Sequence, residues 1–261
     1  MNSSKKSKET VIQSILLVWY KKNKRKLPWR KTNKNNLPNP YYVYVSEYML
    51  QQTTVATVKN RFKDFILKWP SLEALAKISE SRILSFWAGL GYYSRARNLL
   101  KSAKIIKKKF KGNIPNNYND LIILPGIGDY TAKAILGIGY NQPVMPLDAN
   151  IERILARVYG FKKPLIQIKK DLKKKSNSFI SKNFSSDLIQ AFMDYGSIIC
   201  IPRNPNCKIC LIKNRCVSEF ISASSDEMLF CGMAIGYADK NDPINTLKSS
   251  RSPLNEWAKF I

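Results

Sequence analysis

Four of the five cysteines of the chain fall within one short segment, CIPRNPNCKICLIKNRC, at residues 200–216. The gaps between them are six, two and five residues, and the chain has no histidine. The N-terminal MNSSKKSKET lacks the apolar core of a signal peptide, so we expect a reducing, cytoplasmic location in which structural disulfides are rare. Four thiolates suit either zinc or an iron–sulfur cluster, and spacing alone does not decide between the two.

The chain carries a large excess of positive charge, because 44 Lys and Arg against 18 Asp and Glu give a net charge of +26. Lysine runs such as 21–26, 106–111 and 168–175 could be solvated faces. A charge of this size more often serves to bind a polyanion, and nucleic acid is the commonest polyanion. The excess ends near residues 221–225, since the last 37 residues hold four basic and five acidic side chains. That shift predicts a boundary there.

A tight turn with two glycines lies in LPGIGDYTAKAIL, residues 124–136. It separates an apolar segment from a predicted helix at 130–140. Gly126 and Gly128 permit positive φ and the close approach of another backbone. The N–H groups at the start of the second helix can hold a phosphate. In so basic a region, the pattern predicts a helix–hairpin–helix unit that grips the DNA backbone without reading sequence.

Two carboxylates lie on either side of this turn in the sequence. Asp148, in LDANIERIL, precedes a predicted helix, where a lone aspartate is ordinarily an N-cap. Glu47 lies among apolar residues in YVYVSEYMLQQT, which would raise the pKa of its carboxyl group, although an exposed helix glutamate is the plainer reading. Two carboxylates in different environments can divide the work of breaking a glycosidic bond.

Four blocks follow one another along the chain: LPWR (27–30), VSEYMLQQT (45–53), GLGYYSRARNL (89–99), and the PGIG turn with LDAN. Together they resemble the endonuclease III superfamily of DNA glycosylases and, within it, the adenine DNA glycosylases. The resemblance covers about residues 10–218. It implies that the C-x6-C-x2-C-x5-C segment holds a structural 4Fe–4S cluster, with the ligands Cys200, Cys207, Cys210 and Cys216.

The fold class expected from the sequence is all-α, because strand signals are almost absent. Amphipathic patterns predict helices at 10–22, 46–67, 72–78, 80–89, 94–110, 117–124, 130–140, 150–159, 166–182 and 185–199. The resemblance implies two helical domains with the active site in the cleft between them. A six-helix domain with the helix–hairpin–helix would span 31–145, and 1–30 would join 146–220 in an iron–sulfur cluster domain.

The resemblance also assigns roles to single residues. Glu47 matches the acid that protonates adenine and later activates water, and Asp148 matches the anion beneath the developing sugar cation. Tyr130 stands where bifunctional relatives carry a lysine nucleophile, so the resemblance predicts a monofunctional hydrolase. Lys133 is a conceivable but poorly placed replacement for that nucleophile. The resemblance also matches residues to the adenine pocket, to the wedge that fills the gap in the base stack, and to other DNA contacts. These residues are Trp29, Arg30, Leu50, Gln51, Gln52, Tyr92, Gly126, Gly128, Asn150 and Gln190.

The implied partner is double-stranded DNA that carries adenine opposite 8-oxoguanine or guanine. The target adenine must leave the stack, which costs a few kcal/mol. A monomer is expected to act on this DNA, and the implied location is cytoplasmic, with the bacterial nucleoid.

Two features depart from the family. Ala149 stands where the family motif usually has glycine, and we expect it to be tolerated unless that position needs positive φ. About 40 residues follow the cysteines, too few for the C-terminal domain that inspects 8-oxoguanine. Residues 228–260 instead resemble the C-terminal end of FMN-dependent nitroreductases. We expect 221–261 to be a fragment without an independent fold or flavin, with Cys231 unpartnered.

Three other functions stay open at this point. A glycosylase with lyase activity on oxidised pyrimidines is disfavoured by Tyr130 and the LQQT block. A non-catalytic iron–sulfur DNA-binding protein would not need both Glu47 and Asp148. A flavin oxidoreductase rests on the tail alone.

Overall fold

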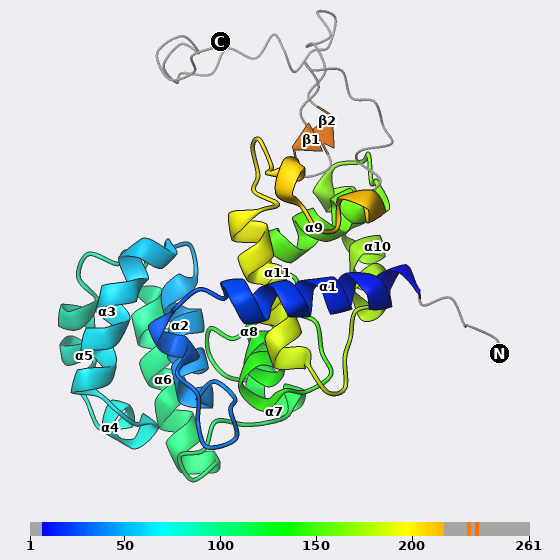
Figure 1. Ribbon diagram of the computed structural model, residues 1–261. Coiled ribbons are helices and arrows are strands. Elements are labelled where there is room, and N and C mark those ends of the chain that lie inside the picture. Colours follow the sequence, from blue (N-terminus) through cyan, green and yellow to red (C-terminus); the bar gives the residue numbers. More distant parts are fainter. Residues whose placement is uncertain (1–6, 217–228, 231–232, 235–261) are drawn as a thin grey trace, which may run out of the picture.

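The computed structural model describes residues 7–216, 229–230 and 233–234. The described chain is helical, which confirms the all-α prediction (Figure 1). Its helices are α1 Lys8–Asn23, η1 Pro28–Arg30, α2 Pro40–Leu50, α3 Val55–Lys68, α4 Leu72–Ala76, α5 Glu80–Trp87, α6 Ser94–Lys109, α7 Tyr118–Ile122, α8 Asp129–Ala134, η2 Ile135–Gly139, α9 Ala149–Tyr159, α10 Leu165–Asn177, α11 Ser185–Ile198, η3 Cys207–Ile209 and η4 Lys213–Arg215. Strands β1 Leu229–Phe230 and β2 Met233–Ala234 pair antiparallel. No helix in the described part is long and apolar enough to cross a membrane.

The helices gather in two groups that meet at α2 and η2. In one group α4 and α5 pack on α6, and α2 packs on α3 and α6. In the other, α11 packs on α1 and α9, and α9 packs on α10. Helix η2 contacts both α2 and α11, and so joins the groups (Figure 1).

Helix α1 packs against α11, which is distant in the sequence, rather than against the helices that follow it along the chain. It lies across α11 (Figure 1). Its buried residues, Ile12, Leu16, Trp19 and Tyr20, recur at the three- and four-residue spacing of one helix face. The ring of Trp19 meets Tyr195 of α11 edge to face, with 4.9 Å between ring centroids. This face therefore anchors the N-terminal helix to the second group.

The predicted helix at 46–67 is wrong as a single helix. The chain forms α2, which begins earlier at Pro40, and α3, which begins at Val55. Pro40 suits the first turn of a helix, where its missing N–H is not needed. The break is at Gln52, whose φ is 53°, and Thr54 then caps α3 by accepting a hydrogen bond from the Thr57 N–H. Glu47 consequently lies near the end of a helix.

The helix predicted at 130–140 begins at Asp129 but changes character at Ile135, where η2 continues as a wider π-type turn. Two glycines explain the close packing there. A Cβ on Gly137 would lie 2.2 Å from Cδ1 of Ile189 in α11, and one on Gly139 would lie 3.2 Å from Cα of Pro40 in α2. The absence of side chains lets both groups of helices approach η2.

The nitroreductase-like prediction for 228–260 and the prediction about Cys231 fall outside the described residues, except for the backbone of β1 and β2.

Candidate active site

A cavity of about 450 Å³ opens where η1, α2, α8, the start of α9, and α11 converge. Most of the predicted site residues line it, namely Trp29, Arg30, Glu47, Leu50, Gln52, Tyr130, Asp148, Asn150 and Gln190. Ala149, which the sequence analysis noted as a departure from the family motif, also lines it. The sequence reasoning missed nine further lining residues, which are Arg25, Leu27, Val43, Ser46, Thr53, Val55, Ile138, Met193 and Ser197. Segments far apart in the sequence thus supply one mixed apolar and polar pocket.

Glu47 is the buried carboxyl group of this pocket. It lies on the inner face of α2, and only 7% of the residue is exposed. Burial raises the pKa of Glu47 to about 8, and the nearby charge of Asp148 adds to that increase. A hydrogen bond from Tyr130 acts in the opposite direction, because it favours the ionised form. At neutral pH the carboxyl group therefore holds a proton that it can donate.

Asp148 occupies the N-cap of α9, as its sequence context predicts, and it also lines the pocket. Its Oδ1 accepts the Ile151 N–H at 2.7 Å, and its Oδ2 accepts from Asn150 Nδ2 at 2.8 Å. Burial raises the pKa of Asp148, while these hydrogen bonds and the charge of Arg153 oppose that rise. The carboxylate is held in one orientation beside Glu47.

Ala149 does not disturb this arrangement. It is the first residue of α9, and it is not among the described non-glycine residues with positive φ. A glycine is therefore not required here, which agrees with the expected tolerance.

Asn150 is in turn held by a buried arginine behind the pocket. Arg153 Nη2 donates to Asn150 Oδ1 at 2.8 Å and to the Gly196 carbonyl at 2.7 Å. Its Nε donates to the Cys200 carbonyl at 2.7 Å. The cysteine segment and Asp148 are thus connected through Arg153 and Asn150.

Tyr130 interacts with both carboxyl groups. Its hydroxyl hydrogen bonds Glu47, and burial together with both negative charges raises its pKa well above the ordinary value. The tyrosine is therefore neutral and acts as a hydrogen-bond donor. Lys133, one turn along α8, is engaged by Asp129 at 2.9 Å and is not among the residues that line the cavity.

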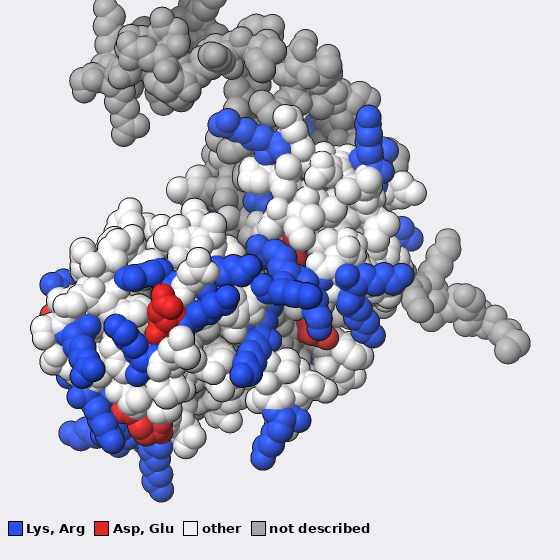
Figure 2. Space-filling view, turned by 60° about the vertical axis from the view of Figure 1, so that its left-hand side comes forward, with Lys and Arg blue, Asp and Glu red and all other residues white. Residues whose placement is uncertain are grey.

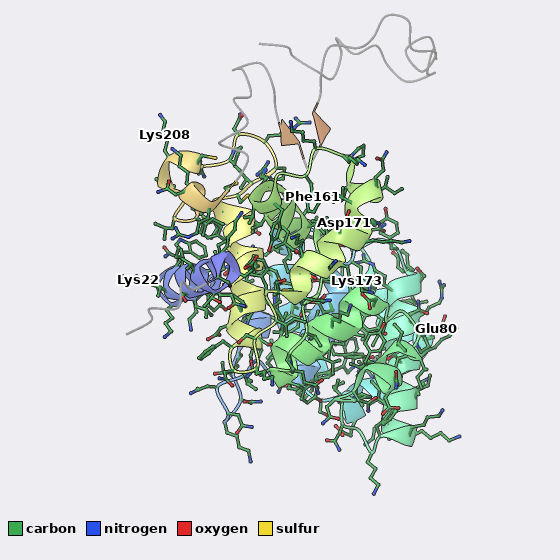
Figure 3. All side chains as sticks on the ribbon, turned by 90° about the vertical axis from the view of Figure 1, so that its right-hand side faces the viewer. Lys22, Glu80, Phe161, Asp171, Lys173 and Lys208 are labelled. Carbon is green, nitrogen blue, oxygen red and sulfur yellow. The ribbon has the colours of Figure 1, made fainter. Side chains whose placement is uncertain are left out.

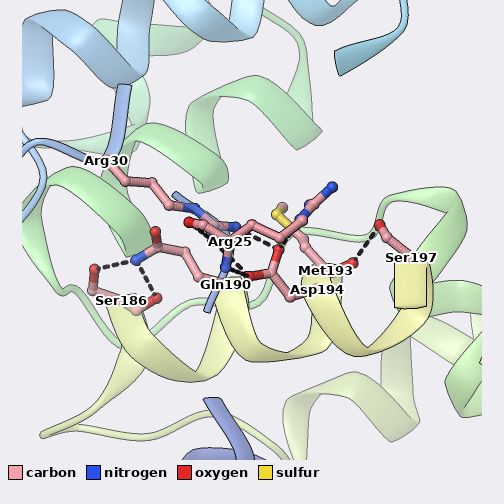
Figure 4. Close-up of polar contacts among 7 residues, drawn as sticks. All are labelled: Arg25, Arg30, Ser186, Gln190, Met193, Asp194 and Ser197. Atoms are coloured by element: carbon pink, nitrogen blue, oxygen red, sulfur yellow. Dashed lines mark hydrogen bonds and ion pairs between the residues drawn. The ribbon is translucent and has the colours of Figure 1, made fainter. Parts of the chain in front are cut away.

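A second set of polar contacts involves other residues of the cavity wall (Figure 4). Arg30 binds the fully buried Asp194 with two hydrogen bonds, Nη1 to Oδ2 at 2.6 Å and Nη2 to Oδ1 at 2.8 Å. Arg25 adds a contact from Nε to Oδ1 at 2.5 Å. Burial alone would raise the pKa of Asp194, but Arg30 and Arg25 hold it below its ordinary value. Arg30 is therefore fixed by a residue that the sequence analysis did not select.

Gln190 places an unpartnered oxygen in the same wall. Its Nε2 donates to the carbonyl and hydroxyl of Ser186 at 3.0 and 3.2 Å (Figure 4). Its Oε1 is buried without a hydrogen-bond partner in the described structure. A buried acceptor of this kind costs free energy unless a ligand supplies a donor. Gln190 thus brings an unsatisfied acceptor to the region of the pocket.

Four of the residues predicted to contact DNA are not among those that line the cavity, namely Gln51, Tyr92, Gly126 and Gly128. The two glycines form the turn between α7 and α8, where Gly126 has φ 81° and Gly128 is the N-cap of α8. Gln51 Nε2 donates to the Gly126 carbonyl at 3.2 Å, and Tyr48 hydrogen bonds the Pro125 carbonyl. The end of α2 is therefore tied to the glycine turn.

The face shown in Figure 2 carries many lysines and arginines and few acidic residues. On another side, Lys208 is exposed on the cysteine segment (Figure 3). A surface of this charge attracts polyanions.

The cysteine segment folds as two short turns, η3 and η4, beside α9 and α11. Arg157 Nη1 donates to Cys200 Sγ at 3.2 Å, and Cys216 Sγ lies 3.3 Å from the Arg157 carbonyl. The Tyr195 hydroxyl donates to Cys210 Sγ at 3.3 Å. Donors aimed at sulfur fit thiolate ligands, although no three His, Cys, Asp or Glu side chains of the described part are grouped to hold a single ion. In an iron–sulfur cube each cysteine binds a different iron.

Comparison with known protein families identifies the superfamily of the chain that forms this pocket. The family described as HhH-GPD superfamily base excision DNA repair protein matches residues 45–181. This chain belongs to that superfamily. The match runs from within α2 to just beyond α10, and so includes Glu47, Tyr130 and Asp148.

Relatives within the HhH-GPD superfamily carry a more specific description. A protein of Buchnera aphidicola subsp. Baizongia pistaciae described as adenine DNA glycosylase is 43% identical over 209 residues, which is 80% of this chain and 58% of that protein. A human protein with the same description is 37% identical over 236 residues, which is 88% of this chain and 43% of the human one. The chain thus spans about half the length of these relatives.

Solved structures agree with the HhH-GPD fold. A thermostable thymine-DNA glycosylase superposes with a TM-score of 0.72 at 27% identity, over 81% of this chain and 96% of the other. An endonuclease III in a non-covalent DNA complex superposes with a TM-score of 0.64 at 20% identity, over 82% of this chain and 96% of the other. At that identity the second likeness concerns the fold alone.

Proposed function

We propose that this protein is a monofunctional adenine DNA glycosylase that hydrolyses the N-glycosidic bond of adenine opposite 8-oxoguanine or guanine. The observation that carries the proposal is the pairing of Glu47 and Asp148 in one pocket of an HhH-GPD chain, one buried with a pKa near 8 and the other held by fixed donors. The descriptions of the relatives support adenine as the base.

Glu47 begins the proposed reaction as a general acid. Its carboxyl group protonates a ring nitrogen of the flipped adenine, so the electron pair of the breaking C1′–N bond moves to the base. The departing adenine leaves a cationic sugar. The Glu47 carboxylate then takes a proton from the water that adds to C1′, which restores the acid.

Asp148 stabilises the sugar cation in this scheme. Its hydrogen bonds from Ile151 and Asn150 favour the charged carboxylate and fix its direction. Because these donors are already in place, little reorganisation is needed when the cation forms.

Other residues of the cavity wall select the base in this scheme. The buried Oε1 of Gln190 suits the exocyclic amine of adenine, and Trp29 and Leu50 provide apolar surface for its ring. Arg30, fixed by Asp194, borders the same space. A pocket whose buried acceptor needs a donor discriminates against bases that lack one.

Tyr130 supports hydrolysis over lyase chemistry. A tyrosine cannot form the imine that a lysine forms with the sugar. Its neutral hydroxyl bonded to Glu47 suits a role in orienting the acid.

Double-stranded DNA is the proposed partner of a monomer, in the cytoplasm with the nucleoid. The turn at Gly126 and Gly128 would grip the backbone, and Gln51, Gln52 and Tyr92 would enter the stack opened by the flipped base. The proposed domains are 31–145 and 1–30 with 146–220. The packing of α1 on α11 supports the return of the N-terminal helix to the second domain, while η1 packs on α2 and α3 of the first group.

The cofactor proposed for the cysteine segment is a 4Fe–4S cluster held by Cys200, Cys207, Cys210 and Cys216. Bound there, it would hold the segment and its basic side chains in shape. Iron and sulfide analysis tests this, with Cys200→Ser expected to lower the iron content and Cys231→Ser expected to leave it unchanged. Equal iron content in both variants would contradict the assignment.

A single-turnover excision assay tests the proposed function. Duplexes with adenine opposite 8-oxoguanine or guanine, and a thymine-glycol duplex, would be treated with the wild type, Glu47→Gln and the exposed control Glu80→Gln. We expect adenine release by the wild type and the control, and none by Glu47→Gln. DNA binding without adenine release, or release of thymine glycol, would overturn the proposal.

A further inference from the structure

Arg95 is a buried arginine that the proposed reaction does not use. It lies in the first turn of α6, and only 5% of the residue is exposed. The described structure gives it no ion pair with a carboxylate. Its guanidinium instead donates to the backbone carbonyls of two separate segments. A buried charge that serves only backbone groups needs an explanation, because its desolvation is costly.

One end of the guanidinium closes the C-terminal end of α2. Nη1 donates to the Met49 carbonyl at 2.8 Å, to the Tyr48 carbonyl at 3.3 Å, and to the Gln51 carbonyl. The last carbonyls of a helix lack partners within the helix, and a positive charge there is favourable. Arg95 thus fixes the turn that follows Glu47 and leads to Gln52.

The other end holds the loop of residues 88–93, between α5 and α6. Nη2 donates to the Leu90 carbonyl at 2.8 Å and to the Gly91 carbonyl at 3.1 Å. The guanidinium also lies over the ring of Trp87, at 5.6 Å from its centroid, and over that of Tyr92, at 5.5 Å. One planar group therefore joins both segments.

Each of the two segments presents an exposed side chain on a strained backbone. Gln52 has φ 53° and Tyr92 has φ 47°, and both are exposed, Tyr92 by 61%. Asparagine accounts for three of the six described non-glycine residues with positive φ, and it adopts this conformation readily. Gln52 and Tyr92 are two of the remaining three, and neither adopts this conformation readily. Such strain persists only where the surroundings enforce it.

We propose that Arg95 is a positioning residue that holds the turn at Gln52 and the loop at Tyr92 as one rigid unit, so that both side chains enter the DNA stack together. The inference rests on the proposed action on DNA and deepens it. Lysine could not replace Arg95, because a single ammonium cannot donate to both segments at once as the two ends of the guanidinium do.

The test uses a duplex with 2-aminopurine beside the mispair, whose fluorescence rises when its neighbour leaves the stack. The wild type, Arg95→Met and Arg95→Lys would be compared at saturating protein. Arg97→Met is the matched control, because Arg97 lies on the same helix in an exposed pair with Glu80. We expect the fluorescence gain to fall about tenfold in both Arg95 variants, since a positive-φ residue loses its enforced conformation, and to be kept by Arg97→Met.

Thermal unfolding and circular dichroism identify variants that still fold. A folded Arg95→Lys with the wild-type fluorescence gain would overturn the inference, even if Arg95→Met is unfolded. The readout does not require excision. If the wild type unstacks DNA without releasing adenine, the proposed chemistry fails and the role of Arg95 stands. If the wild type gives no fluorescence gain, the role of Arg95 is overturned.

Discussion

The guanidinium of Arg153 donates a hydrogen bond to the side chain of Asn150, with 2.8 Å between Nη2 and Oδ1. Asn150 donates onward to Asp148, while Arg153 also holds the carbonyl of Cys200. The position of the pocket carboxylate thus depends on a buried charge that is not among the residues that line the cavity.

Replacing Arg153 with methionine should slow adenine release about 10- to 100-fold, because hydrogen bonds that involve a charged group are each worth ~1.5–3 kcal/mol. Asn150 would lose its anchor, and Asp148 its fixed direction. Single-turnover rates at saturating protein measure the effect, with the exposed Lys174→Met as the control. A folded Arg153→Met with the wild-type rate would show that these contacts do not serve the reaction.

The rate of excision should depend on pH through Glu47. The reaction needs the protonated carboxyl group, whose pKa is about 8. The single-turnover rate should therefore be nearly constant from pH 6 to 7 and fall tenfold per pH unit well above 8. A rate that rises through pH 8 would contradict the role of Glu47 as the acid.

The same buried group should affect stability, with a defined sign. Glu47 has a pKa of about 8 in the folded chain against an ordinary value of 4.5, so its contribution to stability is full below pH 4.5 and is lost as pH rises to 8. At pH 7 the unfolded chain ionises Glu47 freely, whereas the folded chain keeps the carboxyl group protonated, which costs free energy of folding. Glu47→Gln removes this cost and should stabilise the protein at pH 7 by up to about 3 kcal/mol. Urea unfolding of both proteins at pH 5 and pH 7 measures the difference, which should be larger at pH 7.

Tyr130 should determine whether a covalent intermediate forms. Borohydride should trap no adduct between the wild type and its substrate, because no lysine is among the described residues that line the cavity. Tyr130→Lys should yield a trapped adduct, provided that burial leaves the amine neutral. Lys133→Met tests whether Lys133 can act as the nucleophile. If the wild type gives a trapped adduct and Lys133→Met gives none, the nucleophile is Lys133.

The two glycines of the turn should respond differently to alanine. A Cβ on Gly126 would lie 2.8 Å from Cε1 of Tyr48 and 2.9 Å from Cβ of Asn98, at φ 81°. Gly126→Ala should therefore cost about 1–3 kcal/mol of stability. Gly128 has ordinary φ and open space around it, so Gly128→Ala should change the melting temperature little. If DNA phosphates approach this turn, Gly128→Ala should still weaken DNA binding, and unchanged binding would argue against that contact.

The sequence could predict the side chains whose chemistry is local. Glu47 is surrounded by apolar neighbours in its own helix, and Asp148 precedes a helix, so both environments can be read from nearby residues. Nine residues expected at the site do line one cavity.

Contacts between distant segments could not be predicted in this way. Arg25 belongs to a lysine-rich run that resembles a solvated face, yet it contacts Asp194, 169 residues away. An acidic residue four positions after Gln190 on an apolar helix was the one available signal. The break at Gln52 was hidden for the same reason, because the group that stabilises it is Arg95 of another helix.

The pairing of α1 with α11 has a consequence for the newly made chain. The 175 residues from Asn23 to Ile198 must be synthesised before the apolar face of α1 can be covered. At roughly 5–20 residues per second, that face waits on the order of ten to thirty seconds on the ribosome. The nascent protein is then open to chaperones and to aggregation. Packing of α1 on α11 is thus the step that completes the second group of helices.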